Sequence, residues 1–411
     1  MAKQERVAAL DLGATWITCV LAETTENSRI RIAGVGRKRA EGWHNGAVVN
    51  PDKATEAVAE AWQTASDAAG FRLDNVFISI TGEHIKYIRA KGSGAVKRPH
   101  KGISMADRTR VIEEAQAIAL PRDEMILHVI PTQYIVDGQK GVTEPRGMYG
   151  MKLDVEVHIV IAPLSVIENI YRVIGQAGLR VKAPLLRGMA ATIAATTVEE
   201  RKMGVAVVNI GATTEVVVYK DGAIRHNQVI TLGGDHITND ISVGLRIPQP
   251  AAEQIKIDAG VAMQNRVTTD EPITIQATTG PKQISRRLLA SIIEPRVEEI
   301  MLHVDGTMRK SGLTDSLANG IVLTGGTARL AGIDALAEQV FNLPVRIGTP
   351  GDIDAKPEIA CDPSYASVVG LVRYGLGRTD DTGTVIQAKK HGSFSEWLNE
   401  SVSDLFGKKK H

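Results

Sequence analysis

The 411-residue chain has few aromatic residues and almost no net charge. Phe, Trp and Tyr make up 4% of it against 43% hydrophobic residues in all, so the core must come from Ala, Val, Ile and Leu. At this length more than one domain is expected. A net charge of +1 excludes a global field that would recruit nucleic acid, so any anion or membrane binding has to come from local groups.

Cysteines and long apolar runs are also scarce. Cys19 and Cys361 stand far apart without CxxC spacing, which argues against a disulfide framework or a zinc site and fits a reducing compartment. The apolar run near the amino terminus is too short for a signal peptide, and no stretch reaches the ~20 apolar residues of a spanning helix. We therefore expect a cytoplasmic protein.

The first half of the chain predicts a meander of strands, a helix and an inserted unit. Strands are expected at 7–10, 17–22 and 30–35, with a turn at Gly13-Ala14-Thr15 between the first two. A helical pattern over 54–69 ends at Gly70, a typical C′ residue, and a strand over 75–81 follows. The inserted subdomain, 83–163, has a basic, Gly-rich stretch at 91–101, a helix opened by Ser104, and strands near 126–136 and 155–161.

The second half repeats this plan, which predicts an internal duplication. A strand over 205–210, a turn at Gly211-Ala212-Thr213-Thr214 and a strand over 215–219 echo the start of the chain. After them we expect helices at 236–244 and 249–259, a Thr- and Gln-rich insert at 265–283, two helices at 285–293 and 296–311 on either side of Pro295, and a strand at 320–323.

Three glycine turns recur in the order that a two-lobed nucleotide site requires. They are Asp11-Leu12-Gly13-Ala14-Thr15, Asn209-Ile210-Gly211-Ala212-Thr213-Thr214 and Leu323-Thr324-Gly325-Gly326-Thr327. Each turn alone is typical of an ordinary hairpin. Together, backbone N–H groups and Thr hydroxyls of two such hairpins can hold the phosphates of ATP without a Walker lysine, because glycine permits close approach.

Further residues complete this predicted site. Asp11, at a strand end beside the phosphates, is expected to hold the waters of a Mg²⁺ ion. Adenine and ribose are expected between the lobes, next to Gly325, Gly326 and the helix that carries Glu253 and Lys256.

These motifs, with the segment Leu232-Gly233-Gly234-Asp235, resemble the phosphate, connecting and adenosine motifs of the actin, Hsp70 and sugar-kinase superfamily. Within it the chain resembles the FtsA family of bacterial cell-division proteins. The segments that carry this resemblance are Leu127-His128-Val129-Ile130-Pro131, Ile293-Glu294-Pro295-Arg296, Gly320-Ile321-Val322-Leu323-Thr324-Gly325-Gly326, Val345-Arg346-Ile347-Gly348 and Ser367-Val368-Val369-Gly370-Leu371.

The resemblance implies an α/β, actin-like, duplicated two-lobed fold with an FtsA-type inserted subdomain. Its subdomains are expected at 1–82 (1A), 83–163 (1C), 164–199 (1A continued), 200–245 (2A), 246–317 (2B, partner-binding), 318–350 (2A continued) and 351–377 (return to lobe 1), followed by a linker at 378–392 and a terminal helix at 393–411. It also implies ATP and Mg²⁺ as cofactors. The nucleotide site then comprises Asp11, Gly13, Ala14, Thr15, Trp16, Asn209, Gly211, Ala212, Thr213, Thr214, Gly233, Gly234, Asp235, Glu253, Lys256, Gly325, Gly326 and Thr327.

The family resemblance further implies a filament former that tethers the tubulin-like FtsZ ring to the inner membrane at the division site, as a peripheral protein on its cytoplasmic face, where later cell-division proteins join. The C-terminal peptide of FtsZ is expected to dock near Lys282, Arg286, Arg287 and Arg296. The alternative is that these are solvated helix charges.

The chain departs from the family pattern around the phosphates. A Lys usually follows the first turn and an Asp usually begins the second, but Trp16 and Asn209 stand there. An amide cannot take the carboxylate's part with metal-bound water. ATP binding with weak or absent hydrolysis is therefore expected, and no catalytic residue is assigned. His128, His158 and His303 lie singly among apolar residues and predict no metal site.

The carboxyl terminus has an amphipathic pattern. On a helical wheel one face gathers Phe394, Trp397, Leu398, Val402, Leu405 and Phe406, and Lys408, Lys409 and Lys410 follow. The segment predicts a membrane-targeting helix, started by a capping box of Ser393 and Glu396. Its acidic polar face keeps open a partner-helix interpretation, and a C-terminal core helix is a further alternative.

Two other functions share this fold. A PilM-like scaffold of type IV pilus assembly has the Gly-Gly-Asp segment and the inserted subdomain but lacks such a tail. A small-molecule kinase would need an acidic base beside an acceptor pocket. The tail therefore favours the cell-division function.

Overall fold

The computed structural model describes residues 5–277, 280–377 and 386–387. Its first sheet begins with a hairpin. Strands β1 and β2 are antiparallel, β3 extends the meander, and β6 and β11 run parallel to β1 on its other side. The sheet order is β11 (Arg180–Leu186), β6 (Asn75–Ile80), β1 (Arg6–Leu12), β2 (Trp16–Thr24) and β3 (Ile30–Arg39). The predicted strands and turn are confirmed here.

The second sheet repeats the first strand by strand. Its order is β18 (Val345–Ile347), β17 (Ile321–Thr324), β12 (Val205–Ile210), β13 (Thr214–Lys220) and β14 (Ala223–Ile230). Again a meander of three antiparallel strands is extended by two parallel ones. The duplication inferred from the sequence is therefore a duplication of sheet topology.

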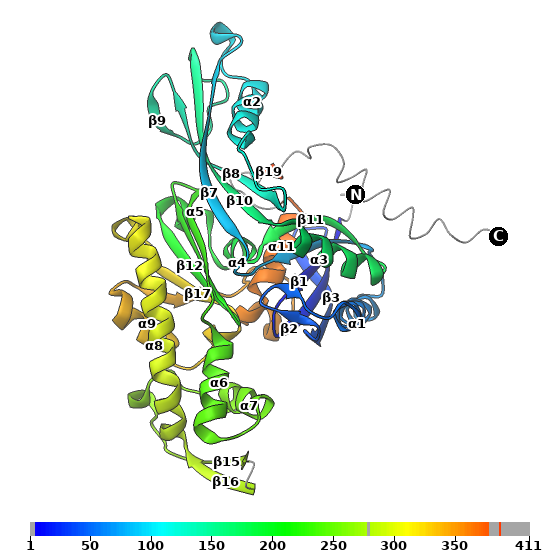
Figure 1. The fold of residues 1–411 in the computed structure, drawn as a ribbon, viewed down its shortest axis with the longest axis vertical. Coiled ribbons are helices and arrows are strands. Elements are labelled where there is room, and N and C mark those ends of the chain that lie inside the picture. Colours follow the sequence, from blue (N-terminus) through cyan, green and yellow to red (C-terminus); the bar gives the residue numbers. More distant parts are fainter. Residues whose placement is uncertain (1–4, 278–279, 378–385, 388–411) are drawn as a thin grey trace, which may run out of the picture. The chain divides into compact units, whose positions relative to one another are not determined.

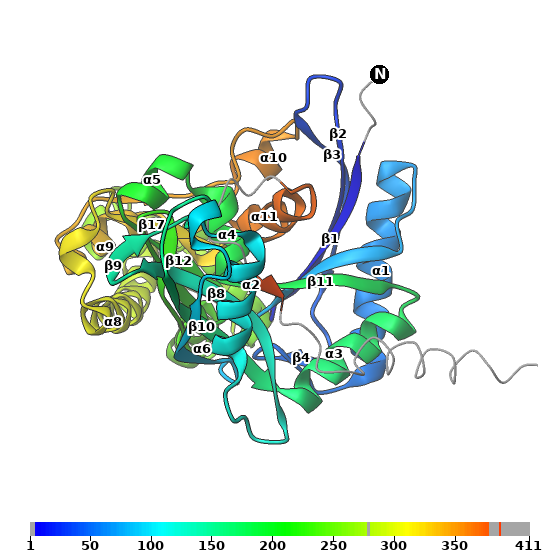
Figure 2. The same ribbon diagram turned by 90° about the horizontal axis from the view of Figure 1, so that it is seen from above.

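One buried helix contacts both sheets, and a second packs against it. Helix α4 (Arg187–Ala195) contacts β12 and β13 of the second sheet and β6 and β11 of the first, while α11 (Ala366–Gly375) lies against α4 and against β1. Figure 2 shows α11 with β1 on one side and the second sheet beyond α4 on the other. The start of α4 is thereby fixed between the two hairpins, which matters for the site below.

The remaining elements cover the sheets or connect them. Helix α1 begins at Pro51 after the cap Asn50, ends at Gly70, which has φ 73°, and packs on β3. The other elements are β4 (Trp43–His44), β5 (Ala47–Val48), α1 (Pro51–Ala69), α3 (Leu164–Gln176), α5 (Val198–Met203), α10 (Pro357–Ala360) and short 3-10 turns at Pro99–Lys101, Gln264–Arg266, Thr314–Ser316, Gly326–Arg329 and Pro363–Tyr365.

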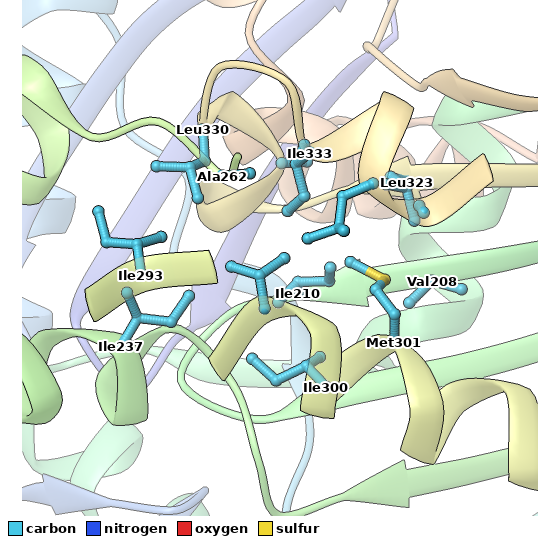
Figure 3. Packing of buried hydrophobic residues seen from close by; sticks show 14 of the residues in the cluster. Val208, Ile210, Ile237, Ala262, Ile293, Ile300, Met301, Leu323, Leu330 and Ile333 are labelled. Carbon is cyan, nitrogen blue, oxygen red and sulfur yellow. The ribbon is translucent and has the colours of Figure 1, made fainter. Parts of the chain in front are cut away.

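A large apolar core lies between the second sheet and its helices. The helices are α6 (Gly234–Leu245), α7 (Gln249–Ala259), α8 (Arg286–Ser311) and α9 (Ile333–Phe341), with a hairpin of β15 (Pro272–Ala277) and β16 (Gly280–Ser285). In Figure 3 the side chains of Ile293, Ile300 and Met301 from α8 meet Val208, Ile210 and Leu323 of the sheet. This core supports the strands that end at the second and third glycine turns.

The expected break at Pro295 is wrong, because α8 is one continuous helix (Figure 1). Its buried residues keep helical spacing across the proline, from Ile293 to Val297 and Ile300, while Pro295 itself faces solvent. A proline within a helix costs about 3 kcal/mol, but each buried aliphatic side chain contributes roughly 1.5–3 kcal/mol. The continuous apolar face therefore outweighs the lost hydrogen bond.

Residues 88–161 form a second compact unit with residues 386–387. Its sheet has the order β19 (Ile386–Gln387), β8 (Glu124–Val136), β10 (Lys152–Pro163) and β7 (Lys86–Ala95), and β9 (Gln139–Val142) pairs with β8. Helix α2 (Met105–Gln116) starts at the expected Ser104, which forms a capping box with Asp107. Two features were not expected: part of the Gly-rich stretch is strand β7, and two residues of the expected linker form β19.

Candidate functional site

The glycine turns of the two sheets line one cleft, in the unit built from residues before 88 and after 161. Most of the expected nucleotide residues are among its lining: Asp11, Gly13, Ala14, Thr15, Trp16, Gly211, Ala212, Gly234, Asp235, Glu253, Lys256, Gly326 and Thr327. They come from β1–β2, β12–β13, the start of α6, α7 and the turn after β17. The structure thus brings together residues that are more than 300 positions apart in the sequence.

Five expected residues do not line the cleft: Asn209, Thr213, Thr214, Gly233 and Gly325. All five are buried. The Thr214 hydroxyl donates to the Leu232 carbonyl at 2.8 Å, so it ties the second turn to the segment before α6. These residues support the turns from the side away from the cleft. The sequence alone could not distinguish such supporting residues from residues that line the cleft.

Two glycines are required by close approach. A Cβ on Gly234 would lie 2.3 Å from Thr327 Oγ1, and the Gly234 N–H donates to the Gly211 carbonyl at 2.7 Å. Gly325 has φ 88°, and a Cβ there would lie 2.6 Å from Asn209 Oδ1. The second turn, the third turn and the start of α6 therefore meet at distances that no side chain permits.

Helix α7 places a fixed cation at the cleft wall. Lys256 Nζ donates to the Gly234 carbonyl at 3.0 Å and to Thr238 Oγ1 at 2.7 Å, and it pairs with Glu253 at 2.6 Å. Three contacts leave the ammonium little freedom. Glu253 and Lys256, expected as adenosine contacts, hold each other and the start of α6 in place.

At the first hairpin, Asp11 is already engaged. Its Oδ1 accepts a hydrogen bond from Ser79 Oγ at 2.6 Å, and its Oδ2 pairs with Arg187 Nη2 at 3.1 Å. Arg187 also lines the cleft, but sequence reasoning missed it. The available signal was an Arg-Gly pair directly before an apolar stretch, Met189 to Ala195.

A second carboxylate, also missed, lies close behind the cleft. Glu215 on β13 accepts hydrogen bonds from the Gly188 N–H at the start of α4 and from Thr81 Oγ1. Burial raises the pKa of Glu215 above its ordinary value, although these donors and Arg187 act against that rise. An acid directly before three valines on a buried strand was the signal for it.

Two arginines lie over the ring of Trp16, the residue for which the family resemblance led us to expect a Lys. The guanidinium carbons of Arg37 and Arg39 lie 4.5 and 4.3 Å from its ring centroid. Arg37 is exposed and lines the cleft. Strand β3 therefore supplies the positive charge, and the indole orients it by cation–π contact.

The expected partner residues divide into two groups. Lys282 on β16 and Arg287 at the start of α8 are exposed. Arg286 Nε donates to the Ala259 carbonyl at 3.1 Å, and Arg296 makes a two-pronged contact with Asp240 at 2.6 and 3.2 Å. Arg286 and Arg296 thus brace α8 against its neighbours, while Lys282 and Arg287 remain accessible.

The predicted membrane residues from Phe394 to Lys410 lie outside the described residues. Among the helices that are described, none combines the length and the apolar character needed to cross a bilayer.

Two family models match the chain. "Cell division protein FtsA" matches residues 206–370, and "SHS2 domain inserted in FTSA" matches residues 82–161. The second match covers the compact unit built around β7, β8 and β10.

Solved structures show the same fold at low identity. The PilM–PilN type IV pilus biogenesis complex matches with a TM-score of 0.65 and 15% identity over 90% of this chain and 98% of that one. MreB5 of Spiroplasma citri bound to ADP matches with a TM-score of 0.54 and 13% identity over 91% and 97%. These likenesses confirm the actin-like fold class.

Curated relatives are much closer in sequence. Cell division protein FtsA of Pseudomonas aeruginosa is 35% identical over 91% of this chain and 90% of its own length. The Bacillus subtilis protein is 34% identical over 91% and 84%, and the Escherichia coli protein is 30% identical over 97% of both chains. The chain therefore belongs to the FtsA family of cell-division proteins.

Proposed function

We propose that this chain binds ATP in the cleft, polymerises on the cytoplasmic face of the inner membrane, and tethers the FtsZ ring there at the division site. The observation that carries the proposal is the convergence of the turns at Gly13, Gly211 and Gly326 on a single cleft. The division into subdomains 1A, 1C, 2A and 2B given above is part of this proposal.

The cleft suits a polyphosphate chemically. Backbone groups of three glycine turns surround it, together with four cations: Lys256, Arg37, Arg187 and Arg329. MreB5, whose fold is similar, has been solved with ADP and with AMPPNP. Hydrolysis is expected to be weak or absent, because Asn209 is an amide, Asp11 is paired with Arg187, and Glu253 is paired with Lys256.

The FtsZ-binding part of the proposal rests on the exposed cations of β16 and α8. An acidic or carboxylate-ended peptide would contact Lys282 and Arg287 directly, and Arg286 and Arg296 would hold the helix that presents them. The charge pair Arg296–Asp240 joins α8 to α6, so its loss would act on the surface through the position of α8.

Attachment to membrane is assigned to the segment 393–411. One short amphipathic helix binds a bilayer weakly, so polymerisation is needed to present many tails together. The Escherichia coli relative matches 97% of this chain, whereas the Pseudomonas aeruginosa relative matches 91%. Later cell-division proteins are expected to join the membrane-bound filament.

Electron microscopy of the full chain with ATP on a lipid monolayer tests polymerisation and attachment together. Filaments are expected on the monolayer, and removal of 393–411 or Trp397→Glu should abolish vesicle co-sedimentation while ATP binding persists. Equal sedimentation of all three proteins would contradict membrane attachment by this segment.

The PilM-like alternative is supported only at the level of the fold. The pilus protein shares 15% identity with this chain, against 30–36% for the FtsA relatives. Of the three described carboxylates that line the cleft, Asp11 and Glu253 are held in ion pairs, so neither offers the free base that a kinase would need beside an acceptor pocket.

A further inference from the structure

Arg187 lies between the two phosphate-facing turns. It is the first residue of α4, and its side chain is 15% exposed. A Cβ on Gly13 would lie 3.2 Å from its Nη2, and a Cβ on Gly211 would lie 3.1 Å from its Nη1. The guanidinium therefore stands between the hairpins of the two sheets.

Two carboxylates stabilise the positive charge of this guanidinium. Asp11 contacts it at 3.1 Å, and Glu215, fixed by Gly188 and Thr81, lies near enough to interact with it electrostatically. Burial lowers the pKa of Arg187, but the two carboxylates offset this, and the net direction is upward. The cation is a permanent part of the cleft.

Not all N–H groups of the Arg187 guanidinium donate hydrogen bonds within the described residues. One N–H of Nη2 serves Asp11, whereas Nε is buried and, among the described residues, has no hydrogen-bond partner. A planar guanidinium with five N–H groups is suited to bridge a carboxylate and a phosphate. A phosphate oxygen between Gly13 and Gly211 would accept a hydrogen bond from Nη1, which lies 3.1 Å from the position of a Cβ on Gly211.

A magnesium ion does not fit the same place. Mg²⁺ requires oxygen ligands at about 2.0–2.1 Å in octahedral geometry, usually including one or two carboxylates. The Asp11 carboxylate, expected to hold that ion through water, is bonded to Ser79 and Arg187 instead. The other two carboxylates of the cleft lining are no better suited: Glu253 is paired with Lys256, and burial raises the pKa of Asp235, which disfavours its charged form.

We propose that Arg187 takes the place of the metal: it is a built-in counter-ion for the nucleotide phosphates, so that ATP and ADP bind without Mg²⁺. This inference rests on the proposed nucleotide binding.

Isothermal titration calorimetry of the full chain with ATP, in excess MgCl₂ or in excess EDTA, tests the proposal. The two dissociation constants should agree within about threefold. Arg187→Ala should weaken binding in EDTA by about tenfold or more, since it removes a charge-assisted contact, and Arg187→Lys should lose less. The control is Arg309→Ala, which removes an exposed arginine of α8 and should bind like the wild type.

The outcomes separate this inference from the proposed function. Binding by the wild type that weakens tenfold or more in EDTA overturns the role of Arg187 and leaves nucleotide binding intact. Absence of binding under both conditions overturns both. Circular dichroism shows whether Arg187→Ala is folded; if it is not, the wild type and Arg187→Lys decide, because neither leaves Asp11 without a cation.

Discussion

The two hairpins that face the cleft share a backbone plan but place their acids differently. In β1–β2, Asp11 stands on the first strand and Thr18 lies opposite it. In β12–β13, Asn209 holds the position equivalent to Asp11, two residues before a glycine, and Glu215 lies opposite. The duplication has kept the topology while the carboxylate has crossed to the neighbouring strand.

This difference indicates that the fold determines where the cleft lies, whereas individual side chains determine its chemistry. Asp11 faces the cleft and pairs with Arg187, whereas Glu215 is turned toward the start of α4 and Thr81. The same arginine is influenced by both acids. Four substitutions test this difference between the hairpins, in decreasing order of the effect that we expect.

The largest effect is expected where the third turn supports the second hairpin. Gly325→Ala should lower the free energy of unfolding by about 3 kcal/mol or more, because φ is positive and the new methyl would meet Ile210 and Asn209. The matched control is the next residue: Gly326→Ala meets nothing within 4 Å. Thermal unfolding and soluble yield measure both, and equal losses would show that the turns are not packed as described.

Giving the second hairpin the acid of the first should also destabilise the protein. Asn209→Asp would bury a carboxylate opposite Glu215 on the neighbouring strand, at a cost of about 1–3 kcal/mol at neutral pH. Asn342→Asp, on an exposed left-handed residue after α9, is the control. If Asn209→Asp is as stable as the wild type, this part of the protein tolerates another negative charge, and the expected cost of burying that charge is wrong.

Glu215→Gln tests the second acid through pH. Burial raises the folded-state pKa of Glu215, so its contribution to stability is complete below its ordinary pKa and is lost as pH rises through the raised value. Glutamine has no such loss. The melting temperature of Glu215→Gln relative to the wild type should therefore increase from about pH 4 to pH 8. Glu298→Gln, on the exposed face of α8, should show no comparable trend.

Trp16→Phe should have the smallest effect on affinity. The cation–π contacts with Arg37 and Arg39 are worth about 0.5–1 kcal/mol at an exposed site, so ATP binding should weaken less than about fivefold. Because Trp16 lines the cleft, a nucleotide should change its fluorescence. That change should disappear in Trp16→Phe, and its persistence would place the bound nucleotide away from the first turn.

The sequence predicted the sheets, the three turns and most lining residues, because glycine patterns and strand periodicity are local. It failed where distant elements decide the outcome. Pro295 suggested a helix end, but its exposed position and the apolar face of α8 overrode the local preference. Arg187 and Glu215 were missed because only the packing of α4 between the two sheets brings Arg187 to the cleft and Glu215 close behind it.

A crystal structure of the full chain grown with AMPPNP would show where the nucleotide lies. We expect its phosphates between Gly13 and Gly211, with Arg187 against them and Gly326 on the nucleoside side. A nucleotide bound elsewhere, or a cleft that stays without one at saturating concentration, would contradict this expectation.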